Sequence, residues 1–545
     1  MKILGISGSL NYPKNHDSSA ALVVDGKLIA NYEDERFTGS KHSVDFRFPT
    51  TSIRRILKEN NLKLDDIDYI GIPHDPKFEE EYRKRVALEI DPEYTKAPKL
   101  LYQDHHMAHL CDALFQSGFN HCACLITDGM GDSKDSITLA QYKDGKINIL
   151  KKYLAAVSPG IMYSSASYWY TNMGEFAEGK LMGLAPYGKP TEKMPLYMQG
   201  DEIVADFPAY INTDGLTMHE FSQYEFIFDS YFRKNCYPYR ARQEEHDNIM
   251  HYANLAASVQ DRYESIILHI VKYLKDITNE DNLVMSGGCI QNCICNNKIV
   301  ELGLFKDIYA SPAPHDAGCG AGLAFYGAYI NGEKIENKRR KNSYTGKTYS
   351  NDEILKACEG LTVTEYDQTK VARDLKNSKI FAWFQGGSEL GPRALGHRSL
   401  IADPSNRSNL FILNDNLKHR ENWRPLAPSI PEELFDKVFD TPNHQLCEFM
   451  LRTLIIKPEF RKKMIAVCHV DNSTRPQCLE RDQNPEYYDL MMEFYKISGV
   501  PGIINTSFND RGQPIIETPE TAIKFLKEHP DLHGIIFNAK YVVTR

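Results

Sequence analysis

One order of elements occurs twice in this chain, and the repeat restricts the fold more than any other feature of the sequence. In the first copy, an apolar strand is predicted over Lys2–Ser7 and a second over Ala20–Val24, with a polar loop between them. Asp25-Gly26 then makes a tight hairpin into a third strand, Lys27–Tyr32. These three strands are therefore expected to begin the first lobe of a larger fold.

The second copy keeps the order of the elements although not the residues. Its strands are predicted at Ala123–Thr127, Ser136–Tyr142 and Ile147–Leu150, with an acidic turn at Asp128–Asp132 and a hairpin at Asp144-Gly145. Two lobes that open in this way describe the duplicated actin/Hsp70/sugar-kinase architecture, an α/β fold whose two turns face each other across a nucleotide cleft. Hairpins are common, so the pattern alone supports this architecture weakly.

Length and composition narrow the class of protein. A chain of 545 residues exceeds one hydrophobic core, so two or more domains are expected. The net charge of −9 argues against broad nucleic-acid binding, although a local basic site remains open. No signal peptide is evident at the N-terminus and no apolar run reaches membrane-spanning length. The 12 scattered cysteines indicate reduced thiols, so a cytoplasmic protein without membrane contact is expected.

A histidine pair opens a predicted helix over Asp104–Ser117. Asp104 suits the N-cap and Gly118 the C-cap. His105 and His109 are one turn apart and share a face, so they can hold one divalent metal if further ligands are supplied. The chain offers carboxylates in suitable turns, and a polar helix start with solvated histidines is the alternative interpretation.

Two glycine-rich stretches suit phosphate binding. An apolar strand from Leu283 runs into Gly287-Gly288, and the helix that follows carries Asn292. In such a turn the backbone N–H groups and the helix N-terminus face an anion, although no GxGxxG or P-loop lysine is present. In Glu178–Gly188, Lys180 could meet a phosphate or carboxylate, and an ordinary glycine-rich loop is the alternative.

The second half of the chain has a different chemistry. A polar stretch, Asn331–Ser350, separates the halves, and its charge run Lys338–Lys341 is predicted to be a solvated linker. Beyond it, cationic side chains stand among glycines, small hydroxyls and amides: Arg393, Lys418, Arg420, Arg424 and Arg475, with Ser507 in Asn505–Asn509. Any single arginine could be a surface ion pair, but the set favours a pocket for a small phosphorylated anion.

The chain resembles the O-carbamoyltransferases of the nodulation and antibiotic-tailoring type, such as the nebramycin, cephamycin and ansamycin carbamoyltransferases. The stretches that carry the resemblance run from end to end: His16–Ala20, Glu35–Thr38, Lys41-His42, His105-His106, Ala108-His109, Glu178–Gly188, Ser286–Gly288, His315–Gly318, Gly391–Ser399, Arg424-Pro425 and Asn505–Asn509. One departure is visible after Phe37, where Thr-Gly-Ser-Lys-His-Ser replaces the family's more usual basic residue after Thr and Asp after His.

The resemblance implies two domains with a divided chemistry. Residues 1–340 are expected to form a Kae1-like, actin-type domain that binds ATP and a metal, and residues 341–545 a YrdC-like domain that binds carbamoyl phosphate. The carbamoyl group would reach ATP to give carbamoyl adenylate. The first domain would then transfer the carbamoyl group to the hydroxyl of a small-molecule acceptor. Adenylation supplies the leaving group that a carbamate lacks.

The resemblance also implies roles for individual residues. The metal, usually described as iron, would be held by His105, His109, Asp128 and Asp316. Contacts to ATP, with its Mg²⁺, would come from Lys41, Lys180, Gly287, Gly288 and Asn292. Carbamoyl phosphate would meet Arg393, Lys418, Arg424, Arg475 and Ser507. His16 matches the residue placed at the transfer step, as base or orienter.

Three alternatives are weighed against this function. A threonylcarbamoyl-type tRNA-modifying enzyme uses the same two domain types, but the acidic chain lacks an evident basic face. A hydrogenase-maturation carbamoyltransferase would carry zinc-finger cysteine pairs, which this sequence lacks. A non-catalytic actin-fold ATP-binding regulator leaves the cationic second half unexplained. The acceptor, a sugar or another natural product, and the oligomeric state are left open.

Overall fold

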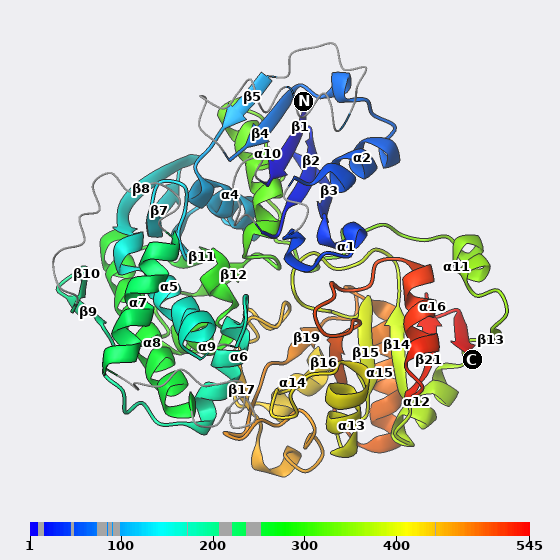
Figure 1. The fold of residues 1–545 in the computed structure, drawn as a ribbon. Helices are drawn as coiled ribbons and strands as arrows, with labels where there is room; N and C mark the ends of the chain where they lie inside the picture. Colours follow the sequence, from blue (N-terminus) through cyan, green and yellow to red (C-terminus); the bar gives the residue numbers. More distant parts are fainter. Residues whose placement is uncertain are drawn as a thin grey trace.

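Two five-stranded sheets with the same strand order build the first part of the chain (Figure 1). The structure is a computed structural model that describes residues 1–8, 16–44, 48–73, 84, 90, 99–171, 173–206, 221–235, 252–441 and 443–545. The first sheet has the order β3-β2-β1-β4-β5, with β1 (Lys2–Ser7), β2 (Ser19–Val24), β3 (Lys27–Glu33), β4 (Tyr69–Ile72) and β5 (Lys99–Tyr102).

The second sheet repeats this order as β8-β7-β6-β11-β12. Its strands are β6 (Cys122–Thr127), β7 (Asp135–Lys143), β8 (Lys146–Leu154), β11 (Asn282–Ser286) and β12 (Asp307–Ala310). In both sheets the first three strands pair antiparallel. The fourth strand, β4 or β11, then pairs parallel with the first, and the fifth, β5 or β12, pairs parallel with the fourth. The α/β class and the duplication predicted from the repeat are confirmed.

Two helices pack between the sheets. α10 (Cys319–Ile330) lies on β1 and β2, and α4 (His105–Ser117) lies on β6 and β11. The two helices approach closely because α10 has a glycine, Gly322, where it touches α4. A Cβ added at Gly322 would fall 1.8 Å from the carbonyl oxygen of Ala108. Their apolar faces share one core with both sheets, which includes Ile3, Leu114 and Ile126. The residues that begin α4 and α10 are thereby fixed relative to both lobes.

Further helices complete the two lobes. α2 (Thr50–Glu59) covers β2 and β3, and α8 (Ala253–Thr278) covers the second sheet. The other helices and strands of the lobes are α1 (Glu35–Thr38), α5 (Pro159–Ser165), α6 (Glu178–Leu184), β9 (Leu196–Gln199), β10 (Glu202–Ala205), α7 (Phe221–Asn235) and α9 (Cys293–Glu301).

The C-terminal part is built on one eight-stranded sheet of order β13-β22-β21-β14-β15-β20-β16-β19. Its strands are β13 (Thr362–Glu365), β14 (Ile380–Phe384), β15 (Arg398–Ala402), β16 (Ala427–Pro431), β19 (Gln477–Leu479), β20 (Ile503–Ser507), β21 (Leu532–Phe537) and β22 (Tyr541–Thr544). Alternate residues of β14 belong to two cores: Phe381 and Trp383 pack with one set of helices, while Ala382 and Phe384 pack with the other.

Helices cover both faces of this sheet. α12 (Gln368–Lys376) and α15 (Pro485–Ser498) lie on one face, and α11 (Asn351–Ala357), α14 (Glu432–Val438) and α16 (Pro519–Glu528) lie on the other. The remaining short elements are α13 (Ser408–Phe411), β17 (Leu454–Ile455) and β18 (Ser473–Thr474). None of the helices within the described ranges is both long and apolar enough to cross a bilayer.

The charge run between the halves is not the solvated linker that its composition predicted. Arg339 forms ion pairs with Asp307 at 2.8 Å and with Glu448 at 3.3 Å. Arg340 donates to the side chain of Gln116 at 2.7 Å. A run of like charges normally faces water, but here carboxylates from both halves of the chain compensate it, and those partners are remote in sequence.

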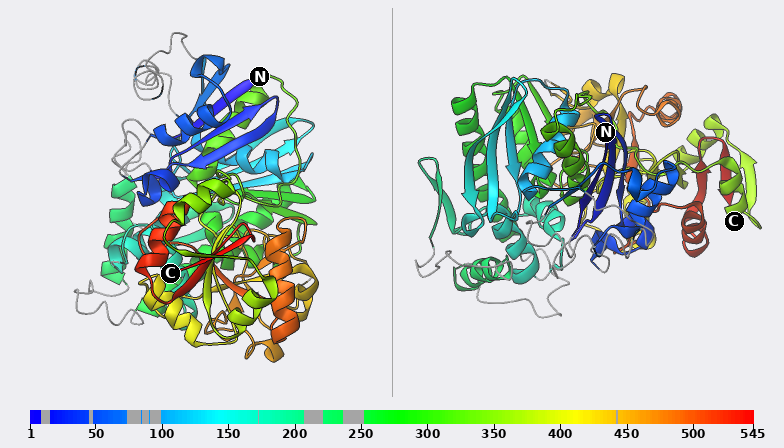
Figure 2. Two further views of the ribbon diagram at one scale, coloured as in Figure 1. Left: turned by 90° about the vertical axis from the view of Figure 1, so that its right-hand side faces the viewer. Right: turned by 90° about the horizontal axis from the view of Figure 1, so that it is seen from above.

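A buried contact also joins the first lobe to the C-terminal part, which lies beside both lobes (Figure 2). The Arg36 guanidinium donates to the carbonyl of Gly391 at 2.6 Å, and the Gly391 N–H donates to the Glu33 carboxylate. Gly391 has φ +94°, and a Cβ there would fall 2.4 Å from the carbonyl oxygen of Pro312 in the second lobe. The glycine therefore permits a junction of three segments, and two residues later the same loop presents Arg393.

Candidate active site

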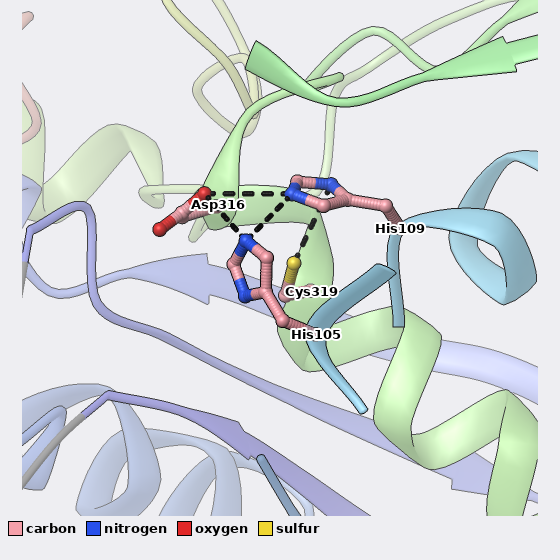
Figure 3. Close-up of side chains that lie close together, drawn as sticks. All are labelled: His105, His109, Asp316 and Cys319. Carbon is pink, nitrogen blue, oxygen red and sulfur yellow. Dashed lines mark hydrogen bonds and ion pairs between the residues drawn. The ribbon is translucent and has the colours of Figure 1, made fainter. Parts of the chain in front are cut away.

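The helix that carries the histidine pair forms as its end signals predict. The Asp104 carboxylate accepts hydrogen bonds from the N–H groups of His106, at 3.0 Å, and Met107, at 3.3 Å. The helix ends at Gly118, which has φ +78°. His105 and His109 consequently project from one face of the first two turns (Figure 3).

All four predicted metal ligands converge at the start of this helix, and we name them the α4 site: His105, His109, Asp128 and Asp316. The two histidine Nε2 atoms are 3.1 Å apart. His105 Nε2 lies 3.2 Å from Asp128 Oδ2 and 3.5 Å from Asp316 Oδ1. His109 Nε2 lies 3.8 Å and 3.5 Å from the same oxygens. Bonds of about 2.1 Å to one ion place neighbouring ligand atoms about 3.0–3.4 Å apart, so the donor set fits one divalent cation.

The diglycine turn positions one of these carboxylates. The Gly288 N–H donates to Asp128 Oδ1 at 3.1 Å, which leaves Oδ2 directed at the histidines. Gly287 has φ +98°, and a Cβ there would fall 2.2 Å from the carbonyl oxygen of Thr127. Glycine is therefore required at this position, because the turn after β11 passes against the end of β6.

Cys319 is a further member of this region that the sequence analysis did not identify. Its sulfur lies 3.5 Å from Nδ1 of His109, and with His105, His109 and Asp316 it forms a group whose potential ligand atoms all lie within 4.8 Å of one another (Figure 3). A proton on Nδ1 shared with the sulfur leaves the Nε2 lone pair facing Asp316, which is the form that binds a metal. The signal in the sequence was its position three residues after Asp316, at the start of α10.

The charges of the α4 site are mutually dependent. Burial opposes charge on His105, but the carboxylates of Asp316 and Asp128 raise its pKa well above the usual range. Burial likewise opposes charge on Asp316, while His105 and His16 lower its pKa well below the usual range. Two buried carboxylates beside two imidazoles therefore favour added positive charge.

His16 lies near this site, within a smaller network. Its Nδ1 is 2.9 Å from Asp17 Oδ2, and the other oxygen of Asp17 is 2.8 Å from Nδ1 of His42. Burial lowers the pKa of His16, but Asp316 and Asp17 outweigh that effect and raise it to about 9. Its side chain is 37% exposed, so a partner from solution can reach the ring.

Backbone strain is concentrated in the same network. Asp17, His42 and Phe176 have φ values of +51°, +58° and +54°, in the region that non-glycine residues rarely adopt. The Phe176 ring stacks on His42, with centroids 4.1 Å apart, and meets the edge of His16 at 5.0 Å. Such strain persists where the surroundings over-determine it, which is typical of functional sites. Neither Asp17 nor His42 was named as a site residue from the sequence.

A second group of charges, which we name the arginine pocket, is entirely cationic. It comprises Arg393, Lys418, Arg420, Arg424 and Arg475 from the C-terminal part and Lys41 from the first lobe. Burial and the neighbouring Arg475 lower the pKa of Arg393. Burial and Arg424 do the same for Arg420, which belongs to the cationic set noted in the sequence but not to the residues that the resemblance assigns to carbamoyl phosphate. Its position between Lys418 and Arg424 was the available signal.

Two arginines of the pocket have unused donors. The Nε atoms of Arg393 and Arg475 are buried and make no hydrogen bond within the part of the chain that the structure describes. A buried donor without an acceptor is costly, and mutual repulsion adds to that cost. An anion with several oxygens would satisfy both.

Other predicted residues of this region are already engaged. Lys418 Nζ lies 2.6 Å from the carbonyl of Ser507 and 2.6 Å from Oδ1 of Asn509, so it braces the turn after β20. The Ser507 hydroxyl lies 2.7 Å from the same Oδ1. Lys180 pairs with Glu421 at 3.3 Å, across the boundary between the lobes and the C-terminal part.

Asn292 is also engaged, as the N-cap of α9. Its Oδ1 accepts from the N–H of Cys295 at 3.1 Å and from Gln260 Nε2 at 3.0 Å. Its Nδ2 donates back to Gln260 at 3.0 Å. The side chain thus holds the helix start, and a direct contact to a nucleotide would require these bonds to be exchanged.

Lys41 connects the two groups of charges. Burial lowers its pKa, Glu35 and Asp17 raise it, and Arg424 of the arginine pocket lowers it. Asp17 also holds His16, so this lysine lies between the histidine network and the arginine pocket. The charge of this lysine is thus influenced both by a carboxylate of the histidine network and by an arginine of the pocket.

Comparison with known proteins agrees along the length of the chain. The family described as Carbamoyltransferase N-terminus matches residues 2–97 and 78–325, and Carbamoyltransferase C-terminus matches residues 372–544. The chain is 30% identical to Nodulation protein NolNO of Sinorhizobium fredii (strain NBRC 101917 / NGR234), with 100% of the chain and 83% of that protein covered.

Two further relatives are informative. Protein sll1178 of Synechocystis sp. (strain ATCC 27184 / PCC 6803 / Kazusa) is 32% identical, with 97% and 95% of the two chains covered. The 3'-hydroxymethylcephem-O-carbamoyltransferase of Streptomyces clavuligerus is 28% identical over 52% of this chain and 54% of its own. On the two family matches, and on the coverage of the relatives from Sinorhizobium fredii and Synechocystis, the chain belongs to the carbamoyltransferase family.

Proposed function

We propose that this carbamoyltransferase forms carbamoyl adenylate from carbamoyl phosphate and ATP and then transfers the carbamoyl group to a hydroxyl of a small molecule. One observation carries the proposal: two carboxylates and two imidazoles that favour a cation converge in the α4 site, while the arginine pocket gathers cations whose Arg393 and Arg475 Nε donors have no acceptor among the described residues. A single-step transfer from carbamoyl phosphate would need the anion pocket alone. The relative from Streptomyces clavuligerus, which is named as an O-carbamoyltransferase, supports a hydroxyl as the acceptor.

In this proposal the α4 site holds the metal, for which the family resemblance indicates Fe²⁺. Its two nitrogens and two oxygens come from α4 and from the turns after β6 and before α10. The ion supplies positive charge that neutralises nucleotide phosphates. Cys319 and Gly288 orient His109 and Asp128, and their loss should loosen the site without removing a ligand.

Carbamoyl phosphate is assigned to the arginine pocket. Arg393 and Arg475 have the unused donors, and a guanidinium suits a phosphate because its fork can meet two oxygens. Lys418 and Ser507 support the pocket by holding its wall, and their positive charge and hydroxyl lie beside it. Arg424 and Lys180 share Glu421, which an incoming phosphate would have to displace.

ATP is assigned between these regions, next to Gly287, Gly288, Lys41 and Lys180, with Mg²⁺ on its phosphates. The turn after β11 and the start of α9 offer backbone N–H groups to an anion. Asn292 contributes by fixing that helix start. In the first step water hydrolyses carbamoyl phosphate to carbamate and phosphate. A carbamate oxygen then attacks the α-phosphorus of ATP, the bond to pyrophosphate breaks, and carbamoyl adenylate forms in an enclosed route that limits its hydrolysis.

His16 is assigned to the transfer step. The acceptor oxygen attacks the carbamoyl carbon, the bond from that carbon to the AMP oxygen breaks, and the hydroxyl proton passes to a base. Asp17 holds Nδ1 of His16 and leaves Nε2 available for this proton. A pKa of about 9 keeps His16 protonated at neutral pH while Asp316 is uncompensated, so neutralisation of Asp316 by a cation would favour the free base.

The test separates the two steps. Carbamoyl-phosphate-dependent exchange of pyrophosphate into ATP reports the adenylate, and product mass reports transfer to each acceptor in a panel of hydroxyl compounds. We expect exchange without any acceptor, and transfer only with the correct one. Exchange that proceeds equally without carbamoyl phosphate would refute the proposed intermediate.

A further inference from the structure

Two histidines and an aspartate from separate segments of the C-terminal part lie together outside the α4 site. His419 Nδ1 is 2.8 Å from Asp510 Oδ1, and His529 Nε2 is 3.8 Å from Asp510 Oδ2. The histidine rings are 5.7 Å apart, centre to centre. Each ring thus faces a different oxygen of one carboxylate.

His529 is held in the form that can bind a metal. Its Nδ1 lies 2.9 Å from the carbonyl oxygen of Phe525, which can only accept, so the proton resides on Nδ1. The Nε2 lone pair is then free on the side of Asp510. The ring is buried and stacks on Phe525, with centroids 3.8 Å apart and planes 12° apart, so its orientation is fixed before any ligand arrives.

The other two members leave an open side. The His419 side chain is 56% exposed, so water or another ligand can complete a coordination shell. His419 has φ +42°, a strained backbone conformation that a simple surface ion pair does not require. Asp510 also accepts from the N–H of Arg511 and lies near Lys418, so its charge is partly compensated.

We propose that His419, Asp510 and His529 form a second site for a divalent transition-metal ion, with Zn²⁺ as the matching probe. Two imidazole nitrogens and a carboxylate are the donor set that Zn²⁺, Ni²⁺ and Cu²⁺ favour over Mg²⁺. The separations of 2.8 Å and 3.8 Å bracket the distances of about 3.0–3.4 Å between neighbouring ligands of one such ion. An ordinary ion pair explains the contact of His419 with Asp510. It does not explain why His529 is held with its Nε2 lone pair toward the same carboxylate.

The position of this site links it to the arginine pocket. His419 follows Lys418, and Asp510 follows Asn509, the residue whose side chain Lys418 holds at 2.6 Å. A bound ion would tie the same two segments together from the other side. Insofar as the pocket binds carbamoyl phosphate, a claim that rests on the proposed function, occupancy should change the KM for that substrate more than kcat.

Zinc titration of the full chain against a chromophoric chelator tests the site itself, independently of activity. We expect His529→Gln and His419→Asn each to bind one equivalent of Zn²⁺ less than the parent, or to bind it at least about tenfold more weakly. His533→Gln is the matched control, since His533 is partly buried on the adjacent strand β21 and packs on Phe381 instead. His105→Ala should lose a different equivalent.

Cobalt gives a second readout of the same site. Co²⁺ bound by His419, Asp510 and His529 should add visible absorption bands that disappear in His419→Asn, an exposed change that leaves folding intact. Equal zinc stoichiometry and affinity in the parent, His529→Gln and His419→Asn would overturn the proposal. So would loss of the same equivalent in His533→Gln. A site confirmed by zinc while pyrophosphate exchange fails would refute the proposed function alone.

Discussion

The α4 site and the arginine pocket are both built from buried charge, but they are unbalanced in opposite directions. In the α4 site two carboxylates face two imidazoles, whose pKa values they raise. In the arginine pocket, burial and like charges lower the pKa values of Arg420 and Lys418, and Glu421 is the nearby counter-charge of the former. The first arrangement favours a bound cation and the second a bound anion, which is the division that the proposed function uses.

In both regions the fold contains buried charged side chains that do not contribute to its stability. A buried charge without full compensation costs free energy, which a hydrophobic residue of similar size would not. Both regions retain such charges at the junction of separately formed segments. We infer that a bound ligand of opposite charge compensates each region. The predictions below each remove one charged or polar side chain from one of them or from its surroundings.

The largest effect is expected at the α4 site. His105→Ala removes one of four converging donors, so we expect loss of bound metal and a fall in product formation of at least about 10³-fold, because metal charge stabilisation is worth several kcal/mol. Elemental analysis of the purified protein and product mass check the two outcomes. His121→Ala, which removes an exposed histidine paired with Asp144, is the control and should retain both. Full metal content in His105→Ala would contradict the ligand assignment.

Removal of His16 should affect only one of the two steps. Loss of a general base lowers the rate of a step by about 10²–10⁴-fold, and asparagine keeps a side chain of similar size without a usable base. We expect His16→Asn to retain carbamoyl-phosphate-dependent pyrophosphate exchange while acceptor product falls by that factor. If exchange is lost as well, His16 belongs to activation or folding. Unchanged rates in both assays would make it a bystander.

A substitution in the arginine pocket should lower kcat/KM for carbamoyl phosphate and leave the metal content of the protein unchanged. Arg393→Ala deletes a guanidinium whose Nε has no partner among the described residues, so little is lost until the anion binds. A charge-assisted contact to a buried phosphate is worth about 2–5 kcal/mol, which corresponds to roughly 30–4,000-fold in kcat/KM for carbamoyl phosphate. Arg481→Ala, an exposed arginine paired with Asp489, is the control. Equal kcat/KM in the parent and Arg393→Ala would disprove the assignment.

The smallest effect concerns a carboxylate on α4 that is not among the converging ligands. Burial raises the pKa of Asp112 to about 7, from 3.8 in an unfolded chain. The folded protein then binds the proton more tightly, so this group lowers stability as pH rises from about 4 to 7. We expect Asp112→Asn to flatten that slope and to be more stable at pH 8 by about 1–4 kcal/mol, measured by denaturant unfolding. Asp276→Asn, an exposed change, should leave the slope unaltered.

Local signals explain why much of the fold could be predicted from the sequence. Asp104 and Gly118 act on their own helix ends, so the bounds of α4 agree with the prediction. The hairpin at Asp25-Gly26 and its counterpart at Asp144-Gly145 are equally local, and the two sheets follow from them. These features need no knowledge of residues far along the chain.

Long-range partners explain what could not be predicted. Arg339 and Arg340 form a run of charge that suits a solvated linker, and only their partners Asp307, Glu448 and Gln116 show otherwise. The engagement of Lys418 with Asn509 and of Asn292 with Gln260 is likewise set by tertiary packing. Cys319 was missed because its sulfur reaches Nδ1 of His109 only through the packing of α10 on α4.

The contact of Glu33 and Arg36 with Gly391 has a practical meaning for exchanging parts between relatives. A chimera joined within residues 331–350 would place the crossover in a stretch whose Arg339 and Arg340 contact both halves of the chain, so those contacts would have to be kept. Its success would also depend on the hydrogen bond from Arg36 to the carbonyl of Gly391, two residues that are more than 350 positions apart in sequence. A donor whose loop carries a side chain at that glycine would clash with the backbone at Pro312. The two parts of a chimera should therefore be chosen so that Glu33 and Arg36 of one fit the loop around Gly391 of the other, before the position of the crossover is considered.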